Sequence, residues 1–528
     1  MTATRHPRAG GAVAAGHPLS ARAGADALAR GGNACDALVA AVLVSWVCEP
    51  TVSGACGGGF LLHRSAAGRV DLLDFFAAAP GLGLDRPVQP MESFEVEFGT
   101  AVQRFHIGAG SCAVPGTAAG LGAAHRQFGS LPWAELVAPA AALARAGVAQ
   151  TTAHAHLNEI LVPVLTLTPE SRAVWAPAGR VLVEGEVMYQ PALADTLDQL
   201  ADAGSEDLYR GTLADAVVAF SEDAGAALTA RDLAAYRVIR RRPVEVLFRG
   251  YRIRTNAPPS SGGLLLAYGL ALHDRLPVAA DPLAAATVRA LAAILREVEA
   301  RRGSELARTL ARGGARRLLS DPSVERGRAR LLDDLRFGPQ PVAGLATPRG
   351  TSHVSVVDAA GNAAAMTSST GCGSGVFAGS TGLHLNNMLG EEDLTGHGTP
   401  RPGERLTSMM SPTIAEGPDG SVLVAGSSGS ARIRSAMHRV LAGMIEHGLE
   451  PGEAVDLPRV HVSPAGLDCE HGFPPATLRE LEAMGERVIA WPDRNIYFGG
   501  AQVATLRAGR FAAAGDPRRG GDAVVVEP

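Results

Sequence analysis

The strongest limit on how this chain can fold is an abrupt change of sequence pattern near residue 350. Residues 337–350, FGPQPVAGLATPRG, hold three prolines and three glycines without apolar periodicity, which is typical of an exposed irregular segment. The pattern before this segment, from Pro115 to about Arg330, is mainly helical. After it, TSHVSVVDAAGNAAAMTSS contains two strand patterns around a DAAGN turn, which predicts a β-hairpin that begins at Thr351.

Helices and strands are predicted on both sides of residue 350. Asn33 follows a glycine pair and can cap a helix that runs apolar to Pro50. Alternation around Gly99 predicts a hairpin over residues 93–107. Further strands are expected in GGGFLLHRS, VDLLDFF, SVLVAGSS and ERVIAW and near residues 244–247 and 251–254, and further helices over 433–447 and 475–484. The sum is a mixed α+β chain.

Every one of the 48 basic residues is an arginine, because the sequence contains no lysine. Schiff-base enzymes, pyridoxal-phosphate enzymes, P-loop nucleotide hydrolases and protein kinases need a lysine amine for a covalent bond or a phosphate contact. The composition therefore excludes all four classes.

Charge, hydropathy and cysteine content also limit the partners of this chain. A net charge of −5 and a pI near 6.3 give no basic surface for a nucleic acid. The N-terminus lacks an apolar signal region and the most apolar stretch, residues 37–48, is too short to cross a bilayer, so we predict a cytoplasmic protein without a membrane partner. The six cysteines form no CxxC pair, and we expect buried thiols, with no metal and no cofactor.

The Gly350–Thr351 junction suggests a specific chemistry. Cleavage of this bond would leave Thr351 with a free α-amine close to its own hydroxyl. The pKa of such an amine is about 7.7 to 8.0, so it can act as the general base that activates the hydroxyl. Glycine at position 350 would tolerate the strained backbone that an acyl shift onto the hydroxyl requires. The alternative is that a Gly-Thr pair simply begins a strand, and the spacing alone favours this plainer interpretation.

The chain resembles the γ-glutamyltranspeptidase family of N-terminal nucleophile hydrolases over nearly its whole length. The segments that carry the resemblance occur in the family's order: GGNACDALVAAVLVSWVCEPTVSGACGGGF, VPGTAAGL, DLYRGTLAD, LTARDLAAY, APPSSGG, TSHVSVVDAAGNAA, GSGVFAGSTGLHLNN, SMMSPT, GSSGSARI and GDPRR.

The resemblance implies a proenzyme that cuts itself before Thr351. The products would be a large subunit of residues 1–350 and a small subunit of residues 351–528, held together in one four-layer αββα sandwich. Thr351 would attack a γ-glutamyl amide, such as a glutathione-like donor, and form an acyl-enzyme. Water or an acceptor amine would then release the acyl group.

The resemblance also assigns roles to other positions. The backbone N–H groups of Gly429 and Ser430 would form the oxyanion hole, which is worth roughly 3 to 4 kcal/mol. Ser369 would hydrogen-bond the amine of the nucleophile, and Ser408 would help to hold the α-carboxylate of the substrate.

Three further residues stand in matching segments without a clear catalytic role. His353 shares a strand face with Thr351, and a packed, hydrogen-bonded histidine is at least as good an interpretation as a catalytic one. Arg432 and Asp516 are interpreted as structural.

The substrate-binding positions depart from the family pattern. Where typical members carry an arginine for the glutamate α-carboxylate, this chain has Asp85, with Arg86 one place on. Asp85 in the pocket would repel a carboxylate, whereas a small shift that brings in Arg86 would preserve recognition, and the sequence leaves both open.

Two other contacts of the family are altered. Thr370, Gly371 and Cys372 replace its amine-binding asparagine, and Cys372 is expected to be a small buried thiol or to line the pocket. The acid for the α-ammonium is Glu391 by direct alignment, within a run that also offers residues 392 and 393; an acidic surface turn is the alternative.

The altered substrate-binding positions and a few isolated motifs suggest other functions for this chain. The same fold could hydrolyse another small amide, such as an oxamate, glutaryl or biosynthetic-intermediate amide, or serve as a non-catalytic scaffold. An amidase-signature enzyme needs a lysine, and no GxSxG elbow supports an α/β-hydrolase. His154, His156 and Glu159 could hold a metal, but such a pattern usually lies on a helix surface.

Overall fold

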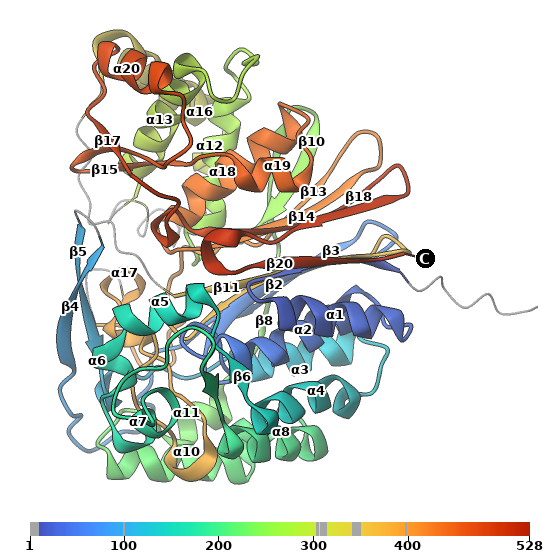
Figure 1. Cartoon of the computed structure of the whole chain (residues 1–528), viewed down its shortest axis with the longest axis vertical. Helices are drawn as coiled ribbons and strands as arrows, with labels where there is room; N and C mark the ends of the chain where they lie inside the picture. Colours follow the sequence, from blue (N-terminus) through green and yellow to red (C-terminus); the bar gives the residue numbers. More distant parts are fainter. Residues whose placement is uncertain are drawn as a thin grey trace, which may run out of the picture.

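The computed structural model describes residues 10–98, 101–302, 306, 314–340, 350–395 and 399–527. Two β-sheets are stacked face to face, and helices cover both outer faces (Figure 1). This arrangement is the predicted αββα sandwich, so the predicted fold class is confirmed.

The first sheet has seven strands in the order β20-β1-β11-β12-β2-β3-β8. Its strands are β1 (Gly11–Ala15), β2 (Gly58–Arg64), β3 (Val70–Phe75), β8 (Ile239–Arg241), β11 (Ser352–Asp358), β12 (Ala363–Ser369) and β20 (Asp522–Val526). All pairings are antiparallel. The predicted hairpin after residue 350 forms as β11 and β12 at the centre of this sheet.

The second sheet has six strands in the order β19-β18-β14-β13-β10-β9. They are β9 (Val244–Phe248), β10 (Tyr251–Thr255), β13 (Thr413–Glu416), β14 (Val422–Ser428), β18 (Gly500–Arg507) and β19 (Arg510–Ala514). Strands β14 and β18 pack against β11 of the first sheet.

Helices α1 (Pro18–Ala29), α2 (Ala34–Cys48) and α3 (Thr117–Phe128) cover the first sheet, and α12 (Gly262–His273) and α18 (Arg432–Ile445) cover the second (Figure 1). Every residue of α2 is buried, which explains its continuous apolar pattern. Asn33 caps this helix as predicted, within a capping box completed by Asp36.

The other elements surround this sandwich. The helices are α4 (Trp133–Ala146), α5 (Thr152–Ile160), α6 (Val162–Leu165), α7 (Pro169–Trp175), α8 (Pro191–Ala203), α9 (Asp207–Arg210), α10 (Thr212–Asp223), α11 (Ala230–Ala235), α13 (Ala285–Ala300), α15 (Gly314–Leu318), α16 (Asp321–Phe337), α17 (Glu392–Thr395), α19 (Pro451–Asp456) and α20 (Pro475–Ala483). The strands are β4 (Glu92–Phe98), β5 (Ala101–Ile107), β6 (Val148–Ala149), β7 (Val187–Met188), β15 (Val460–Ser463), β16 (Gly466–Cys469) and β17 (Val488–Ala490). Short 3₁₀ helices span Ala109–Ser111, Gly379–Thr381, Met388–Gly390, Ile496–Phe498 and Pro517–Arg519.

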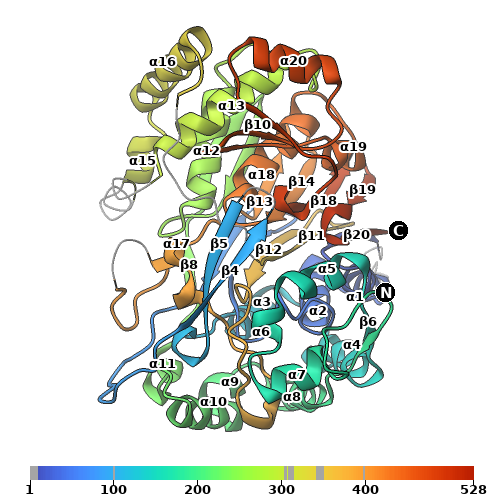
Figure 2. The same cartoon turned by 60° about the vertical axis from the view of Figure 1, so that its left-hand side comes forward.

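The hairpin predicted over residues 93–107 forms as β4 and β5, a separate two-stranded sheet that lies outside the sandwich (Figure 2). Its predicted turn residue Gly99 and most of the irregular segment, residues 341–349, lie outside the described residues. The predicted strand in ERVIAW shortens to β17, which pairs with β16 and joins neither large sheet.

Each large sheet contains strands from both sides of residue 350. In the first sheet β1 lies between β11 and β20, and in the second β13 pairs with β10. A cut before Thr351 would therefore leave two chains joined by strand pairing. The boundary at residue 350 itself stays a prediction.

Within the described part of the chain, no helix combines the length and apolar character needed to span a bilayer. The predicted cytoplasmic location is untested by the structure.

Candidate active site

The Gly350–Thr351 bond lies immediately before β11, and two hydroxyls approach its carbonyl. Thr351 Oγ1 donates a hydrogen bond to the Gly350 carbonyl oxygen at 2.8 Å. Ser369 Oγ donates to the same oxygen at 2.5 Å. Thr351 is only 6% exposed, so both contacts form largely out of water. The predicted nucleophile and one predicted partner are thus brought together at the bond that the sequence marked for cleavage.

Ser369 is held in this orientation by the end of its strand. It is the last residue of β12, where it pairs with Gly58 of β2. The backbone N–H of Gly371 donates to Ser369 Oγ at 2.7 Å, which leaves the hydroxyl proton for the Gly350 carbonyl. The backbone N–H of Thr370 donates to the Val52 carbonyl at 3.2 Å and fixes the chain that follows.

Position 350 needs glycine because the space is crowded. A Cβ there would lie 2.3 Å from the Gly371 carbonyl oxygen and 2.6 Å from Val52 Cγ1. The φ angle of Gly350 is outside the left-handed region, so the backbone conformation itself does not require glycine here. Close approach of neighbouring chain is the physical reason for this glycine.

The turn between β14 and α18 supplies unused backbone donors. Gly429 and Ser430 have φ values of 111° and 52°, both in the left-handed region. Neither N–H donates to a described residue. The turn is near residue 350: Gly429 packs against Gly499, and Tyr497, two residues before Gly499, lines the same pocket as Gly350.

This pocket is lined by segments that lie far apart in the chain. Leu157, Ile160 and Leu161, from α5 and the residue after it, form an apolar wall together with Phe105 of β5. Figure 2 shows α5 and the β4–β5 hairpin on the side of the molecule where both large sheets end. The charged lining residue is Arg519, which is 8% exposed.

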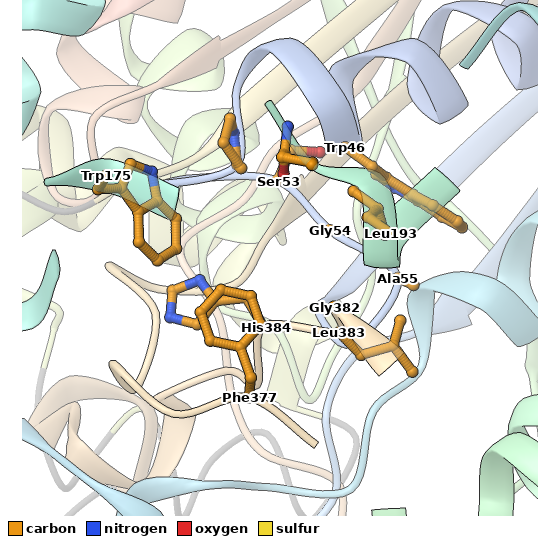
Figure 3. A pocket seen from close by; sticks show the side chains of 12 residues that line it. Trp46, Ser53, Gly54, Ala55, Trp175, Leu193, Phe377, Gly382, Leu383 and His384 are labelled. Atoms are coloured by element: carbon orange, nitrogen blue, oxygen red, sulfur yellow. The ribbon is translucent and has the colours of Figure 1, made fainter. Parts of the chain in front are cut away.

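A second cavity lies beside the loop that carries Pro50, Ser53, Gly54 and Ala55 (Figure 3). Trp46, Trp175, Phe377 and His384 dominate its lining, and the rings of Phe377 and His384 are stacked with centroids 5.2 Å apart. Neither Gly350 nor Thr351 lines this cavity, so it is separate from the bond that the two hydroxyls approach.

His353 is a packed histidine. Its Nδ1 lies 2.7 Å from Thr367 Oγ1 and its Nε2 lies 3.0 Å from Ser355 Oγ. Ser355 Oγ donates to the Gln502 carbonyl, so it accepts from Nε2–H, and Nδ1 accepts from Thr367. Burial lowers the pKa of His353 to about 3. A neutral ring with both nitrogens engaged supports the structural interpretation.

The other predicted substrate contacts are scattered. Thr370 is fully buried, with its methyl group towards Gly54. Glu391 is buried beside Gly371, where a Cβ would lie 2.7 Å from Glu391 Oε1. Cys372 is buried and lines the pocket beside Gly350, so both interpretations of this thiol hold. The side chains of residues 392 and 393 lie outside the described set.

Ser408 contacts a different loop. Its Oγ accepts from the backbone N–H of Met410 at 3.1 Å, and its carbonyl accepts from Ser261 N–H at 2.9 Å and from Ser260 Oγ at 2.9 Å. These hydrogen bonds do not connect Ser408 to Thr351, and the role predicted for Ser408 stays a prediction.

Asp85 and Arg86 lie away from the Gly350 carbonyl. Asp85 is exposed, and Arg86 Nη2 donates to the carbonyl of Ser221 in α10 at 3.0 Å. Neither side chain lines the pocket beside Gly350. The structure therefore does not bring the predicted Arg86 together with Thr351.

Arg432 and Asp516 have the surroundings of structural residues. Arg432 is fully buried with its guanidinium carbon 4.0 Å from the Tyr497 ring centroid. Asp516 forms ion pairs with Arg459 and Arg518 and accepts from the Ala501 N–H at 2.8 Å.

Glu49 and Arg519 are two groups near the site that the sequence did not single out. Ser352, next to Thr351, donates through Oγ to Glu49 Oε2 at 3.1 Å. Burial raises the pKa of Glu49 to about 7. The one available signal for Arg519 was the second arginine of the GDPRR segment, since nothing local reveals that it faces residue 350.

Comparison with known proteins identifies relatives over the whole sandwich. The family described as Gamma-glutamyltranspeptidase matches residues 20–526. The glutathione hydrolase proenzyme of Escherichia coli strain K12 is 31% identical, over 90% of this chain and 86% of that protein. The acylase ACY 1 proenzyme of Pseudomonas sp. strain SE83 is 30% identical, over 93% and 90%. The crystal structure of cephalosporin acylase from Bacillus halodurans superposes with a TM-score of 0.83 at 25% identity, over 98% and 96%.

Proposed function

The chain belongs to the γ-glutamyltranspeptidase family, and from this membership we propose that it is a self-cleaving N-terminal threonine hydrolase. It cuts itself before Thr351 and then transfers or hydrolyses the acyl group of γ-glutamyl amides. The relatives named proenzymes support a precursor, and the relatives named glutathione hydrolase support this donor.

Self-cleavage uses the two hydroxyls at Gly350. Thr351 Oγ1 attacks the Gly350 carbonyl carbon, and Ser369 Oγ donates to the oxygen that becomes negative. The proton that Thr351 Oγ1 gives up passes to the Thr351 nitrogen as the C–N bond breaks, which leaves an ester between Gly350 and the Thr351 oxygen and frees the Thr351 amine. Water hydrolyses the ester, and Gly350 becomes a carboxylate. A positioned donor that stabilises an oxyanion in this way contributes about 3 kcal/mol.

Amide hydrolysis then uses the same hydroxyl with a new base. The free α-amine, whose pKa is about 7.7 to 8.0, accepts the proton of Thr351 Oγ1 as this oxygen attacks the substrate carbonyl. The N–H groups of Gly429 and Ser430 receive the oxyanion, and the amine leaving group takes the proton. Water or an acceptor amine attacks the resulting acyl-enzyme and regenerates Thr351.

One observation carries this proposal: the hydroxyls of Thr351 and Ser369 both donate to the carbonyl of the bond that must break. A strand that merely began with threonine would not need a second hydroxyl on the same oxygen. The N–H groups of the Gly429–Ser430 turn, which donate to no described residue, add the second set of donors.

The test combines maturation with activity. Purified protein is expected to give two bands on a denaturing gel, of 350 and 528 − 350 = 178 residues, and mass spectrometry should find a fragment that begins at Thr351. The mature protein should hydrolyse a chromogenic γ-glutamyl anilide. Thr351→Ala should remain a single chain without activity, because it lacks the nucleophile of both reactions.

Thr351→Ser is the matched control, since it keeps a hydroxyl at the same place and should still mature. An intact chain that hydrolyses the anilide, or an active Thr351→Ala variant, would contradict the proposal. A stable intact chain without activity would instead favour the scaffold alternative.

A further inference from the structure

Arg519 lies next to both parts of the candidate active site. It lines the pocket that contains Gly350. Its Cδ packs against Gly500, which pairs with Ser428 at the end of β14, directly before the Gly429–Ser430 turn. A cation at this place can contact a substrate whose amide carbonyl is held at that turn.

Arg519 is a buried cation without an ion-pair partner among the described residues. Its Nη2 donates to the Ile496 carbonyl at 3.1 Å, whereas its Nε has no hydrogen-bond partner. The preceding residue, Arg518, differs, because it pairs with both Glu470 and Asp516.

The carboxylates whose charges act on Arg519 are already paired with other groups or partly protonated. Asp516 is engaged by Arg459 and Arg518. Glu49 accepts from Ser352, and its pKa of about 7, raised by burial, leaves it partly protonated near neutral pH. Burying a charge without a partner is costly, so this cation is expected to meet an anion from outside the described chain.

The rest of the pocket limits the kind of anion. Leu157, Ile160, Leu161 and Phe105 give it an apolar wall. The described residues that line it include no acidic side chain, so a substrate ammonium would find no carboxylate there.

We infer that Arg519 binds the carboxylate of the acyl donor, and that the apolar wall contacts the chain between this carboxylate and the amide. The donor class is then an amide of a dicarboxylic acid, for which an α-ammonium is not required: a glutaryl-type group fits as well as γ-glutamyl or better. This inference rests on the proposed hydrolase function. It supplies the carboxylate contact that exposed Asp85 and the Ser221-bound Arg86 do not.

The test compares three p-nitroanilides on mature protein: glutaryl, γ-glutamyl and butyryl, the last of which lacks a carboxylate. We expect kcat/KM for the glutaryl substrate to equal or exceed that for γ-glutamyl and to exceed that for butyryl about 100-fold. Arg519→Gln should lower the glutaryl value about 100-fold and the butyryl value less than about threefold. Arg519→Lys should recover part of the loss, and the exposed Arg510→Gln should change nothing.

A second measurement needs neither a folded variant nor catalysis. Calorimetric titration of mature wild-type protein should show glutarate binding at least about tenfold tighter than butyrate. Equal binding of the two acids, or equal losses on all three anilides in Arg519→Gln, would overturn the inference. Equal binding is also expected if the carboxylate that cleavage creates on Gly350 stays bound to Arg519. Mature protein that binds glutarate selectively but cleaves no anilide would instead contradict the proposed hydrolase function alone.

Discussion

Side-chain hydroxyls stand in two different settings around the start of β11. At its start, the hydroxyls of Thr351 and Ser369 converge on a peptide carbonyl and leave that carbonyl activated. Two residues on, the hydroxyls of Thr367 and Ser355 converge on His353 and leave no free nitrogen. In both settings one of the hydroxyls comes from the neighbouring strand β12. The difference shows that the hydroxyl residue type does not decide reactivity here. The group that the hydroxyls contact decides it: a peptide carbonyl in one setting and a histidine ring in the other.

The largest effect after loss of Thr351 itself is expected from Ser369→Ala. Removing the second hydroxyl takes away a donor to the developing oxyanion, which should slow self-cleavage about 100- to 1,000-fold. The measurement is the time course of the two gel bands. Ser368→Ala, one residue earlier on β12, should mature at nearly the normal rate, and equal slowing of both variants would break the distinction between the two settings.

Gly429→Ala tests the turn that faces the same end of β11. The φ of 111° disfavours alanine, and the new Cβ would lie 2.8 Å from Gly499 Cα, so the two N–H groups should move. We expect kcat on amide substrates to fall about 10- to 100-fold. Gly420→Ala is the control, because its φ is also positive, at 80°, but nothing lies within 4 Å of its Cβ. Unchanged kcat in Gly429→Ala would argue against these oxyanion donors.

His353→Asn should affect stability and leave maturation complete. Because burial lowers the pKa of His353 from 6.5 to about 3, the unfolded chain binds a proton that the folded chain does not between these pH values. Folding stability is therefore fully present above about pH 6.5 and is lost as the pH falls towards 3. Urea unfolding should show the variant less stable at pH 7 but with a shallower loss on acidification. Failure of the folded variant to cleave itself would make His353 part of the chemistry.

Glu49→Gln is expected to have the smallest effect, and in the stabilising direction. Burial raises the pKa of Glu49 from 4.5 to about 7, so this carboxyl costs stability as the pH rises from about 4.5 through 7, where the folded protein must ionise it. The amide variant avoids that charge, and its unfolding midpoint should exceed that of wild type at pH 8 but match it near pH 4. A lower midpoint at pH 8 would show that Ser352 needs the ionised form.

Local features of the fold were predictable from the sequence because neighbouring residues determine them. The capping box at Asn33, the apolar run of α2 and the alternation that gives β11 and β12 all depend on residues close together in the chain. The two large sheets could not be assembled from such patterns. The pairing of β1 with β20 joins residues more than 500 positions apart, and no sequence pattern predicted it. The sandwich as a whole was expected only from the family resemblance.

The candidate site divides in the same way. Thr351, Ser369 and the Gly429–Ser430 turn were named because they stand in recognisable segments. The need for glycine at 350 was assigned to backbone freedom, whereas the structure assigns it to the nearby Gly371 carbonyl. Arg86 could not be placed either, since its direction depends on a carbonyl in α10. Contacts of this kind depend on how distant segments pack.

The position of β1 between β11 and β20 has a consequence for the life of the molecule. Before cleavage, these strands find one another within one polypeptide, and linkage limits the entropy lost on assembly. After cleavage, an unfolded molecule would have to insert β1 between two strands of a separate fragment, which makes renaturation depend on concentration. The uncleaved chain therefore assembles the sheet once, before cleavage. The cleaved enzyme is expected to refold poorly after complete denaturation.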